Sequence, residues 1–195
     1  MPPIYLASNS PRRRELLRLA GLPFTVCPSQ VDEAAYAVAD PVTLVETLAL
    51  AKAREVAIRA GRGVSIGADT VVVHQGEILG KPASPAQAQE YLARLAGEAH
   101  LVITGVAVVV GGGLEQVAHE ITRVVFRPLT PEEIAAYVAT GEPLDKAGGY
   151  GIQGLGSLLV ARIEGCYFNI VGLPLARLAT MLARVGLNPL LISHL

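Results

Sequence analysis

Short apolar runs alternate along the chain with segments in which apolar positions recur every three or four residues. The runs predict strands at residues 4–7, 24–28, 64–73, 77–79, 99–110, 114–126 and 158–163. The segments between them predict helices at residues 10–21, 40–61, 84–97, 130–141 and 175–185. The first four helices each begin with Ser, Asp or Thr followed directly by proline, and each ends at a glycine. This alternation predicts an α/β fold.

The predicted sheet contains both strand–helix units and a long antiparallel hairpin, whose turn is Gly111-Gly112-Gly113. We therefore expect one mixed, twisted sheet in two lobes around a central cleft. No internal repeat or low-complexity linker divides the chain, so residues 1–195 are expected to form a single domain. The clearest boundaries between lobes lie near residues 28–40 and 126–130.

Three smaller features complete the expected structure. Gln87 and Glu133 each stand three residues after a helix cap, which predicts a capping box at both helices. Residues 145–157 are rich in glycine and predict a loop. Residues 193–195 are expected to fray.

Composition narrows the class of protein. Of the 195 residues, 51% are hydrophobic and 17% charged, enough apolar material to form a core and exclude a disordered chain. The 16 Lys and Arg nearly balance 17 Asp and Glu, which argues against nucleic-acid binding. Uncharged stretches are too short for a membrane span, and no signal peptide is recognisable. Cys27 and Cys166 predict neither a disulfide nor a zinc site, so a cytoplasmic protein is expected.

The strongest candidate for a binding site is the strand-to-helix turn Ser8-Asn9-Ser10-Pro11-Arg12-Arg13-Arg14. Free N–H groups at a helix start attract anions, guanidinium groups bind phosphate in pairs of hydrogen bonds, and the serines can donate further bonds. The alternative is a capped surface helix with solvated arginines. Cations in the first turn oppose the helix dipole by about 0.3–1 kcal/mol each, so three in succession favour phosphate binding.

The second candidate is Asp69 within Gly67-Ala68-Asp69-Thr70, because aspartate is disfavoured in strands. A buried carboxylate is costly unless it binds a cation or a water that it activates, so the residue is a candidate general base. Gly67 and Ala68 are expected to leave room for a bulky group. The alternative is a strand end at which Asp69 caps backbone groups.

Weaker signals come from Lys52, Lys81, Glu33 and Gln153. Either lysine can contact phosphate, although Lys52 can also extend past its apolar neighbours into solvent. Glu33 can provide carboxylate oxygens for Mg²⁺. Gln153 lies in a glycine-rich segment whose G-x-G-x-x-G spacing lacks the strand and helix of a dinucleotide site, but its amide can recognise the edge of a base.

Together these motifs resemble the Maf family, known as septum-formation inhibitors and nucleoside triphosphate pyrophosphatases. The resemblance extends over nearly the whole chain and rests on six segments: residues 6–17, 31–33, 67–70, 80–82, 145–154 and 171–175. It implies a fold similar to the inosine triphosphate pyrophosphatases, a homodimer, and a divalent metal such as Mg²⁺ or Mn²⁺. The implied reaction cleaves a nucleoside triphosphate between its α- and β-phosphates.

The resemblance also implies roles for individual residues. Asp69 is the expected proton acceptor and, with Glu33, the expected metal ligand. The expected phosphate-binding residues are Ser8, Ser10, Arg12, Arg13, Lys52 and Lys81. Arg12, Thr70 and Gln153 match the members that act on dTTP and UTP, whereas those that act on 7-methyl-GTP tend to have Trp, Gln and Glu there. The remaining alternatives are this second specificity and a regulator of septum formation that binds nucleotides without hydrolysing them.

Overall fold

The computed structural model describes residues 1–36 and 38–192, so the expected fraying of residues 193–195 lies outside the described residues. Its strands form one mixed sheet in the order β2-β1-β3-β5-β6-β7, with β4 paired to β3. They are β1 (Ile4–Leu6), β2 (Thr25–Val26), β3 (Val64–His74), β4 (Glu77–Leu79), β5 (Ala99–Val110), β6 (Glu115–Phe126) and β7 (Val160–Glu164). Parallel pairs join β1 to β2 and to β3, and antiparallel pairs join β4 to β3 and β7 to β6. The predicted α/β class and mixed sheet are confirmed.

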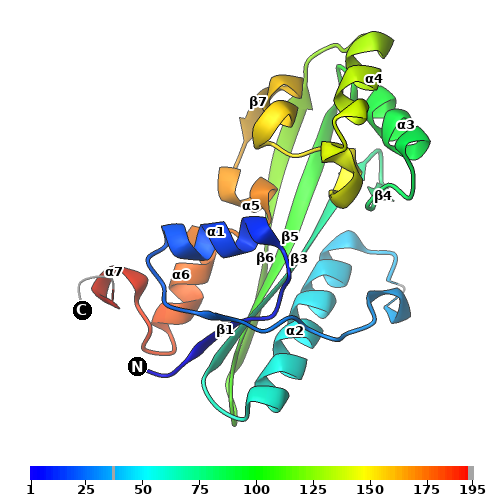
Figure 1. Ribbon diagram of the computed structural model, residues 1–195. Helices are drawn as coiled ribbons and strands as arrows, with labels where there is room; N and C mark the ends of the chain where they lie inside the picture. Colours follow the sequence, from blue (N-terminus) through cyan, green and yellow to red (C-terminus); the bar gives the residue numbers. More distant parts are fainter. Residues whose placement is uncertain (37, 193–195) are drawn as a thin grey trace. The chain divides into compact units, whose positions relative to one another are not determined.

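Helices alternate with these strands along the chain (Figure 1). The α-helices are α1 (Pro11–Leu19), α2 (Pro41–Ala60), α3 (Pro85–Leu95), α4 (Pro131–Ala139), α5 (Tyr167–Val171), α6 (Leu175–Ala183) and α7 (Pro189–Ile192). Short 3₁₀ helices are η1 (Glu33–Ala35), η2 (Glu142–Asp145), η3 (Ala147–Gly149) and η4 (Gly154–Leu159). No helix in this described part of the chain combines the length and the apolar character needed to cross a membrane.

Three local predictions need correction. The loop at 145–157 contains 3₁₀ turns, and η4 delays the following strand to Val160. The short helices α5 and α7 follow no clear apolar period and were not predicted. The capping box at α4 is present, but that at α3 is not: Gln87 Oε1 accepts the N–H of Ala83, one residue before the cap Ser84.

The chain divides into two compact units and passes from one to the other at four points. Unit 1 comprises Met1–Asp69, Thr104–Glu120 and Gly172–Leu195, and unit 2 comprises Thr70–Ile103 and Ile121–Val171. Three of these points fall within β3, β5 and β6, and the fourth follows α5 at Val171. None lies at the boundaries expected near 28–40 and 126–130. The predicted cleft stays a prediction.

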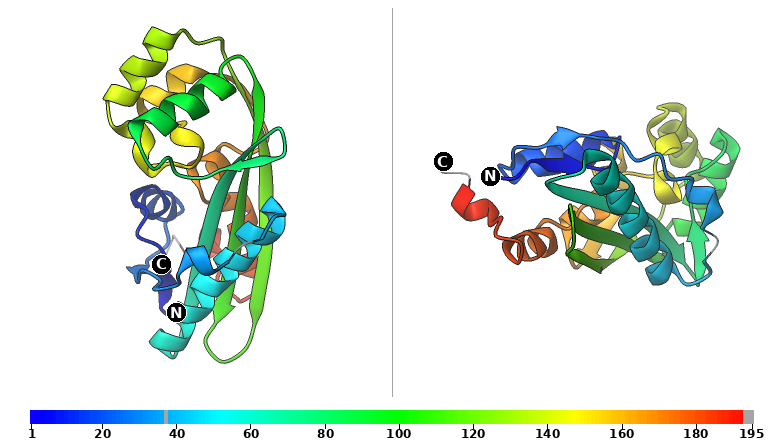
Figure 2. Two further views of the ribbon diagram at one scale, coloured as in Figure 1. Left: turned by 90° about the vertical axis from the view of Figure 1, so that its right-hand side faces the viewer. Right: turned by 90° about the horizontal axis from the view of Figure 1, so that it is seen from below.

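In unit 1 the sheet lies between α2 on one face and α6 on the other (Figure 2). The alternation of side chains along β6 shows this arrangement. Glu115 and His119 contact Arg54 and Glu46 of α2, whereas Gln116 and Glu120 contact α6. Successive residues of a strand point to opposite faces, so both faces of this part of the sheet are covered.

Helix α2 packs unusually close to the sheet because glycines face it. A Cβ on Gly67 of β3 would lie 2.2 Å from the carbonyl oxygen of Ala49, and one on Gly105 of β5 would lie 2.2 Å from that of Val45. The helix contributes small side chains to the same contact, with Ala49 and Ala53 fully buried. The expectation that Gly67 leaves room for a bulky group is therefore wrong, because the backbone of α2 fills that space.

Unit 2 has its own core around an aromatic cluster. Phe126, His100 and Tyr150 pack edge to face, with ring centroids 4.7–5.3 Å apart. Nε2 of His100 lies 2.7 Å from the Tyr150 hydroxyl. Apolar side chains of α3 and α4 complete this core, among them Leu92, Leu95 and Ile134. Tyr150 belongs to the glycine-rich segment, which is therefore fixed to the core at this point.

The buried His100 predicts how stability depends on pH. Burial, reinforced by the charge of His74, lowers the pKa of His100 from 6.5 to about 3. The unfolded chain then binds a proton near pH 5 that the folded chain does not, so this group lowers the free energy of unfolding as pH falls below about 6.5. We expect a loss of about 2 kcal/mol between pH 7.5 and pH 5. Urea unfolding of wild type and His100→Phe at both pH values checks this, since an equal pH dependence in the two proteins would contradict it.

Candidate active site

Asp69, Lys52 and Glu33 converge in unit 1. Asp69 lies in the middle of β3, and its Oδ1 accepts a hydrogen bond of 2.7 Å from Lys52 Nζ. The same ammonium lies 2.7 Å from Glu33 Oε1. Asp69 is thus bound to a cation within a strand, and the alternative that it caps backbone groups at a strand end is wrong.

The local folds explain why these three side chains meet. Gly67 and Asp69 are two residues apart in β3 and so face the same side, toward α2. Because the backbone of α2 contacts Gly67 at Ala49 and Ala53, Lys52 is carried to the neighbouring Asp69. Glu33 is the first residue of η1, whose cap Asp32 accepts the N–H of Ala34.

Burial makes this cluster electrostatically unusual. The side chains of Lys52 and Asp69 are 8% and 12% exposed, whereas that of Glu33 is 54% exposed. The alternative that Lys52 extends past its apolar neighbours into solvent is therefore wrong. The cluster holds two carboxylates around one ammonium, with Arg13 within electrostatic range of both. Buried charged groups gathered in this way are typical of metal-binding and acid–base sites.

The turn before α1 has the predicted cap. Ser10 Oγ accepts the N–H of Arg13 at the start of the helix, and Ser8 Oγ accepts the N–H of Ser10 at 3.1 Å. Arg13 Nη1 also donates to Ser8 Oγ, at 3.3 Å. Each hydroxyl that accepts a bond still has a proton to donate, so the predicted contacts of both serines with phosphate stay predictions.

The first arginines of α1 are within electrostatic range of the carboxylate cluster. Burial lowers the pKa of Arg13, and the charges of Asp69 and Glu33 raise it while that of Arg12 lowers it. Arg13 Nε donates to the carbonyl oxygen of Gly172 at 2.8 Å, which orients the guanidinium. No role was predicted for Gly172, although it lies in one of the six segments that carry the family resemblance.

Lys81, Thr70 and Gln153 belong to unit 2. Thr70 follows Asp69 directly in β3, and Lys81 follows β4. The N–H of Gly148 donates to the carbonyl oxygen of Gly80 at 3.0 Å, which joins the segment of Lys81 to the glycine-rich segment that contains Gln153. The structure therefore brings together two segments that are far apart in the sequence.

A divalent ion fits the chemistry of the carboxylate cluster. Among the described residues no group of three or more His, Cys, Asp or Glu side chains could hold a metal ion. Mg²⁺, however, usually binds through one or two carboxylates and completes its shell with water and substrate phosphates. Glu33 and Asp69 each lie 2.7 Å from one ammonium, so two carboxylates of the type that Mg²⁺ uses are close together here.

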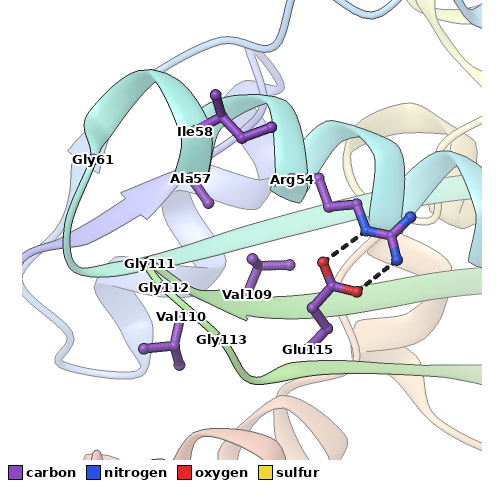
Figure 3. A pocket seen from close by; sticks show the side chains of 10 residues that line it. All are labelled: Arg54, Ala57, Ile58, Gly61, Val109, Val110, Gly111, Gly112, Gly113 and Glu115. Carbon is purple, nitrogen blue, oxygen red and sulfur yellow. Dashed lines mark hydrogen bonds and ion pairs between the residues drawn. The ribbon is translucent and has the colours of Figure 1, made fainter.

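A cavity of about 370 Å³ lies elsewhere in unit 1. Figure 3 shows it between the end of α2 and the hairpin of β5 and β6. Arg54 and Glu115 at its edge already satisfy each other through two hydrogen bonds, and its other lining residues are aliphatic or glycine. None of the predicted site residues lines it, so it is not the site that the motifs indicate.

Comparison with known proteins identifies relatives of this chain. The family model for Maf-like proteins matches residues 3–185. A dTTP/UTP pyrophosphatase of Moorella thermoacetica is 58% identical over 189 residues, or 96% of this chain and 97% of that protein. That of Symbiobacterium thermophilum is 54% identical over 186 residues, or 95% of each chain. A solved dITP/XTP pyrophosphatase from Mycobacterium abscessus superposes with a TM-score of 0.45 at 19% identity. The match covers 71% of this chain and 95% of that protein, and it is too distant to bear on activity.

Proposed function

Because the chain belongs to the Maf family, we propose that it hydrolyses dTTP and UTP to the nucleoside monophosphate and pyrophosphate. The observation that carries this proposal is the buried contact of Asp69 with Lys52, whose ammonium also contacts Glu33. It combines a carboxylate for proton transfer with an adjacent cation. Relatives with this activity in their names match nearly the whole chain at more than half identity. Hydrolysis of this kind removes non-standard or excess pyrimidine nucleotides.

The residues of unit 1 can divide the chemistry between them. A nucleoside triphosphate carries about four negative charges, which Arg12 and Arg13 at the start of α1 can bind. Asp69 accepts the proton of the water that attacks the α-phosphorus. Lys52 holds that carboxylate in place until phosphate oxygens compete for its ammonium, and Ser8 and Ser10 supply further contacts with phosphate. Lys81 of unit 2 stays a predicted phosphate-binding residue.

Glu33 and Asp69 are the side chains that would hold a divalent ion, Mg²⁺ or Mn²⁺. When bound, the ion neutralises charge on the phosphate oxygens and on the leaving pyrophosphate. The two carboxylates support this assignment because they already share one cation, the ammonium of Lys52. The choice between the two metals is tested by adding each to the metal-free protein.

Arg12, Thr70 and Gln153 are the proposed specificity residues. The Gln153 amide can both donate to and accept from the edge of a pyrimidine base. We expect Gln153→Ala to lower kcat/KM for dTTP and UTP about tenfold more than for dATP, because it removes contacts with the base and none with phosphate. Steady-state kinetics with these three nucleotides measure the difference, and an equal loss for all of them would contradict the assignment.

The proposed activity is tested by pyrophosphate release from dTTP, UTP, CTP, dATP and 7-methyl-GTP with Mg²⁺ or Mn²⁺. Preferential release from dTTP and UTP supports the proposal. Preference for 7-methyl-GTP would instead place the chain among the members of the family that act on that nucleotide. Tight binding of dTTP without any product would favour a regulator that binds nucleotides.

Two further properties stay predictions. A homodimer is expected from the family resemblance, and sedimentation of the purified protein tests it. A cytoplasmic location is expected because no signal peptide is recognisable and the two cysteines predict no disulfide.

A further inference from the structure

The Glu142 carboxylate lies at the centre of a hydrogen-bond network in unit 2 that the proposed reaction does not use. Its Oε2 accepts the N–H of Leu155, and its Oε1 accepts the N–H of Gly156, each at 3.1 Å. Oε1 also accepts the hydroxyl of Tyr137 at 2.9 Å. Leu155 and Gly156 are in the first turn of η4, so a carboxylate 13 residues earlier in the chain satisfies the free N–H groups of this turn.

Tyr137 extends this network to the other side of Gln153. Its hydroxyl accepts the N–H of Gly151 at 3.3 Å while it donates to Glu142. Burial raises the pKa of Tyr137, so the hydroxyl keeps its proton and remains a donor. Gly151 and Leu155 stand two residues before and two residues after Gln153, and both are fixed by the same pair of side chains.

The backbone is shaped to fit this pair. Gly154 has φ +65°, and a Cβ there would lie 2.8 Å from Glu142 Oε2. A Cβ on Gly156 would lie 2.7 Å from the Tyr137 hydroxyl. Two glycines of the segment are therefore needed for its close approach to these two side chains.

The network also caps η4 in place of Gln153. Gln153 occupies the N-cap position of η4, yet its side chain makes no capping hydrogen bond. Glu142 supplies that cap in its place. The main chain of Glu142 is fixed as well, because its carbonyl oxygen accepts a bond of 2.5 Å from Lys146 Nζ.

We propose that Glu142 and Tyr137 are positioning residues that hold Gln153 in the orientation required to recognise the base. The inference rests on the proposed function, since it needs Gln153 to contact the base of the substrate. It assigns base selection in part to the buried Tyr137 and the half-buried Glu142, which act through Gln153. Loss of the pair is then expected to affect discrimination between bases more than the hydrolytic step.

The test uses Glu142→Gln, which keeps the size of the side chain but removes its charge, and Tyr137→Phe, which keeps the ring. Glu90→Gln, at an exposed position on α3, is the matched control. We expect both variants to lower the ratio of kcat/KM for dTTP to that for dATP about tenfold, toward the ratio of Gln153→Ala. In the Gln153→Ala background, Glu142→Gln should leave the ratio unchanged, because Glu142 affects base recognition only through Gln153.

Hydrogen exchange gives a readout that does not depend on activity. In the wild-type protein the amides of Leu155 and Gly156 should be protected, and Glu142→Gln should make them exchange at least about tenfold faster. Exchange as fast in wild type as in an exposed loop would overturn the network. The Glu90→Gln control should exchange like the wild type.

The kinetic outcomes separate this inference from the proposed function. Wild-type protein that releases no pyrophosphate from any nucleotide overturns the proposed function and the specificity role with it. If Gln153→Ala loses base preference while Glu142→Gln and Tyr137→Phe keep it, this inference alone is overturned. An equal loss of kcat/KM for all nucleotides in both variants also overturns it, because that result indicates a general structural role.

Discussion

Asp69→Asn is expected to lower the turnover of dTTP at least ~100-fold while nucleotide affinity changes little. Asparagine has nearly the same shape as aspartate but cannot accept the proton of the attacking water. Lys52 keeps Glu33 as a partner, so the cation stays in the site. Pyrophosphate release measures turnover, and calorimetric titration with dTTP measures affinity.

A matched control for this variant is Glu120→Gln. Glu120 lies in β6 of the same unit and pairs with Arg177, a partly exposed pair whose loss costs little. It should retain wild-type turnover. Near-normal pyrophosphate release by Asp69→Asn would remove Asp69 from its role as proton acceptor.

Gly67→Ala is expected to lower the free energy of unfolding by about 3 kcal/mol, near the upper end for an overpacked core. The new Cβ would lie 2.2 Å from the carbonyl oxygen of Ala49 and 2.8 Å from the nitrogen of Ala53, so α2 must move. Because Lys52 lies between those two residues, its ammonium shifts relative to Asp69 and turnover falls as well. Urea unfolding and pyrophosphate release measure the two effects.

Gly113→Ala is the control for added volume at a glycine. No heavy atom lies within 4 Å of a Cβ at that position in the hairpin turn, so its stability should stay close to that of wild type. If Gly67→Ala were as stable as Gly113→Ala, the close packing of α2 on the sheet would be wrong.

The features that could be predicted from the sequence are those set by neighbouring residues. Helix starts were visible because Ser10, Asp40, Ser84 and Thr130 each precede a proline and cap their own helix. The hairpin at Gly111 follows from apolar runs that a glycine turn separates. Asp69 was noticeable because a carboxylate within an apolar run requires a partner, and the structure supplies Lys52.

Features that depend on distant segments could not be predicted. At Gly67 the sequence shows only that a side chain is missing. The helix backbone that fills the space beside it comes from residues 14–18 positions earlier in the chain. Phosphate contact and extension into solvent were both open for Lys52. The sequence shows on which face of its helix it lies, but not which segment packs against that face. Glu142 was missed because it caps a 3₁₀ turn across a loop, a contact without any periodic signal. The glycines at 154 and 156, which allow its close approach, predicted only a loop.

The most direct test of the central claim is hydrolysis of dTTP in ¹⁸O-labelled water with Mg²⁺, followed by mass spectrometry of both products. Attack on the α-phosphorus by water that Asp69 activates predicts that the label enters dTMP and that the pyrophosphate stays unlabelled. Label in the pyrophosphate, or formation of dTDP with labelled orthophosphate, would contradict the account.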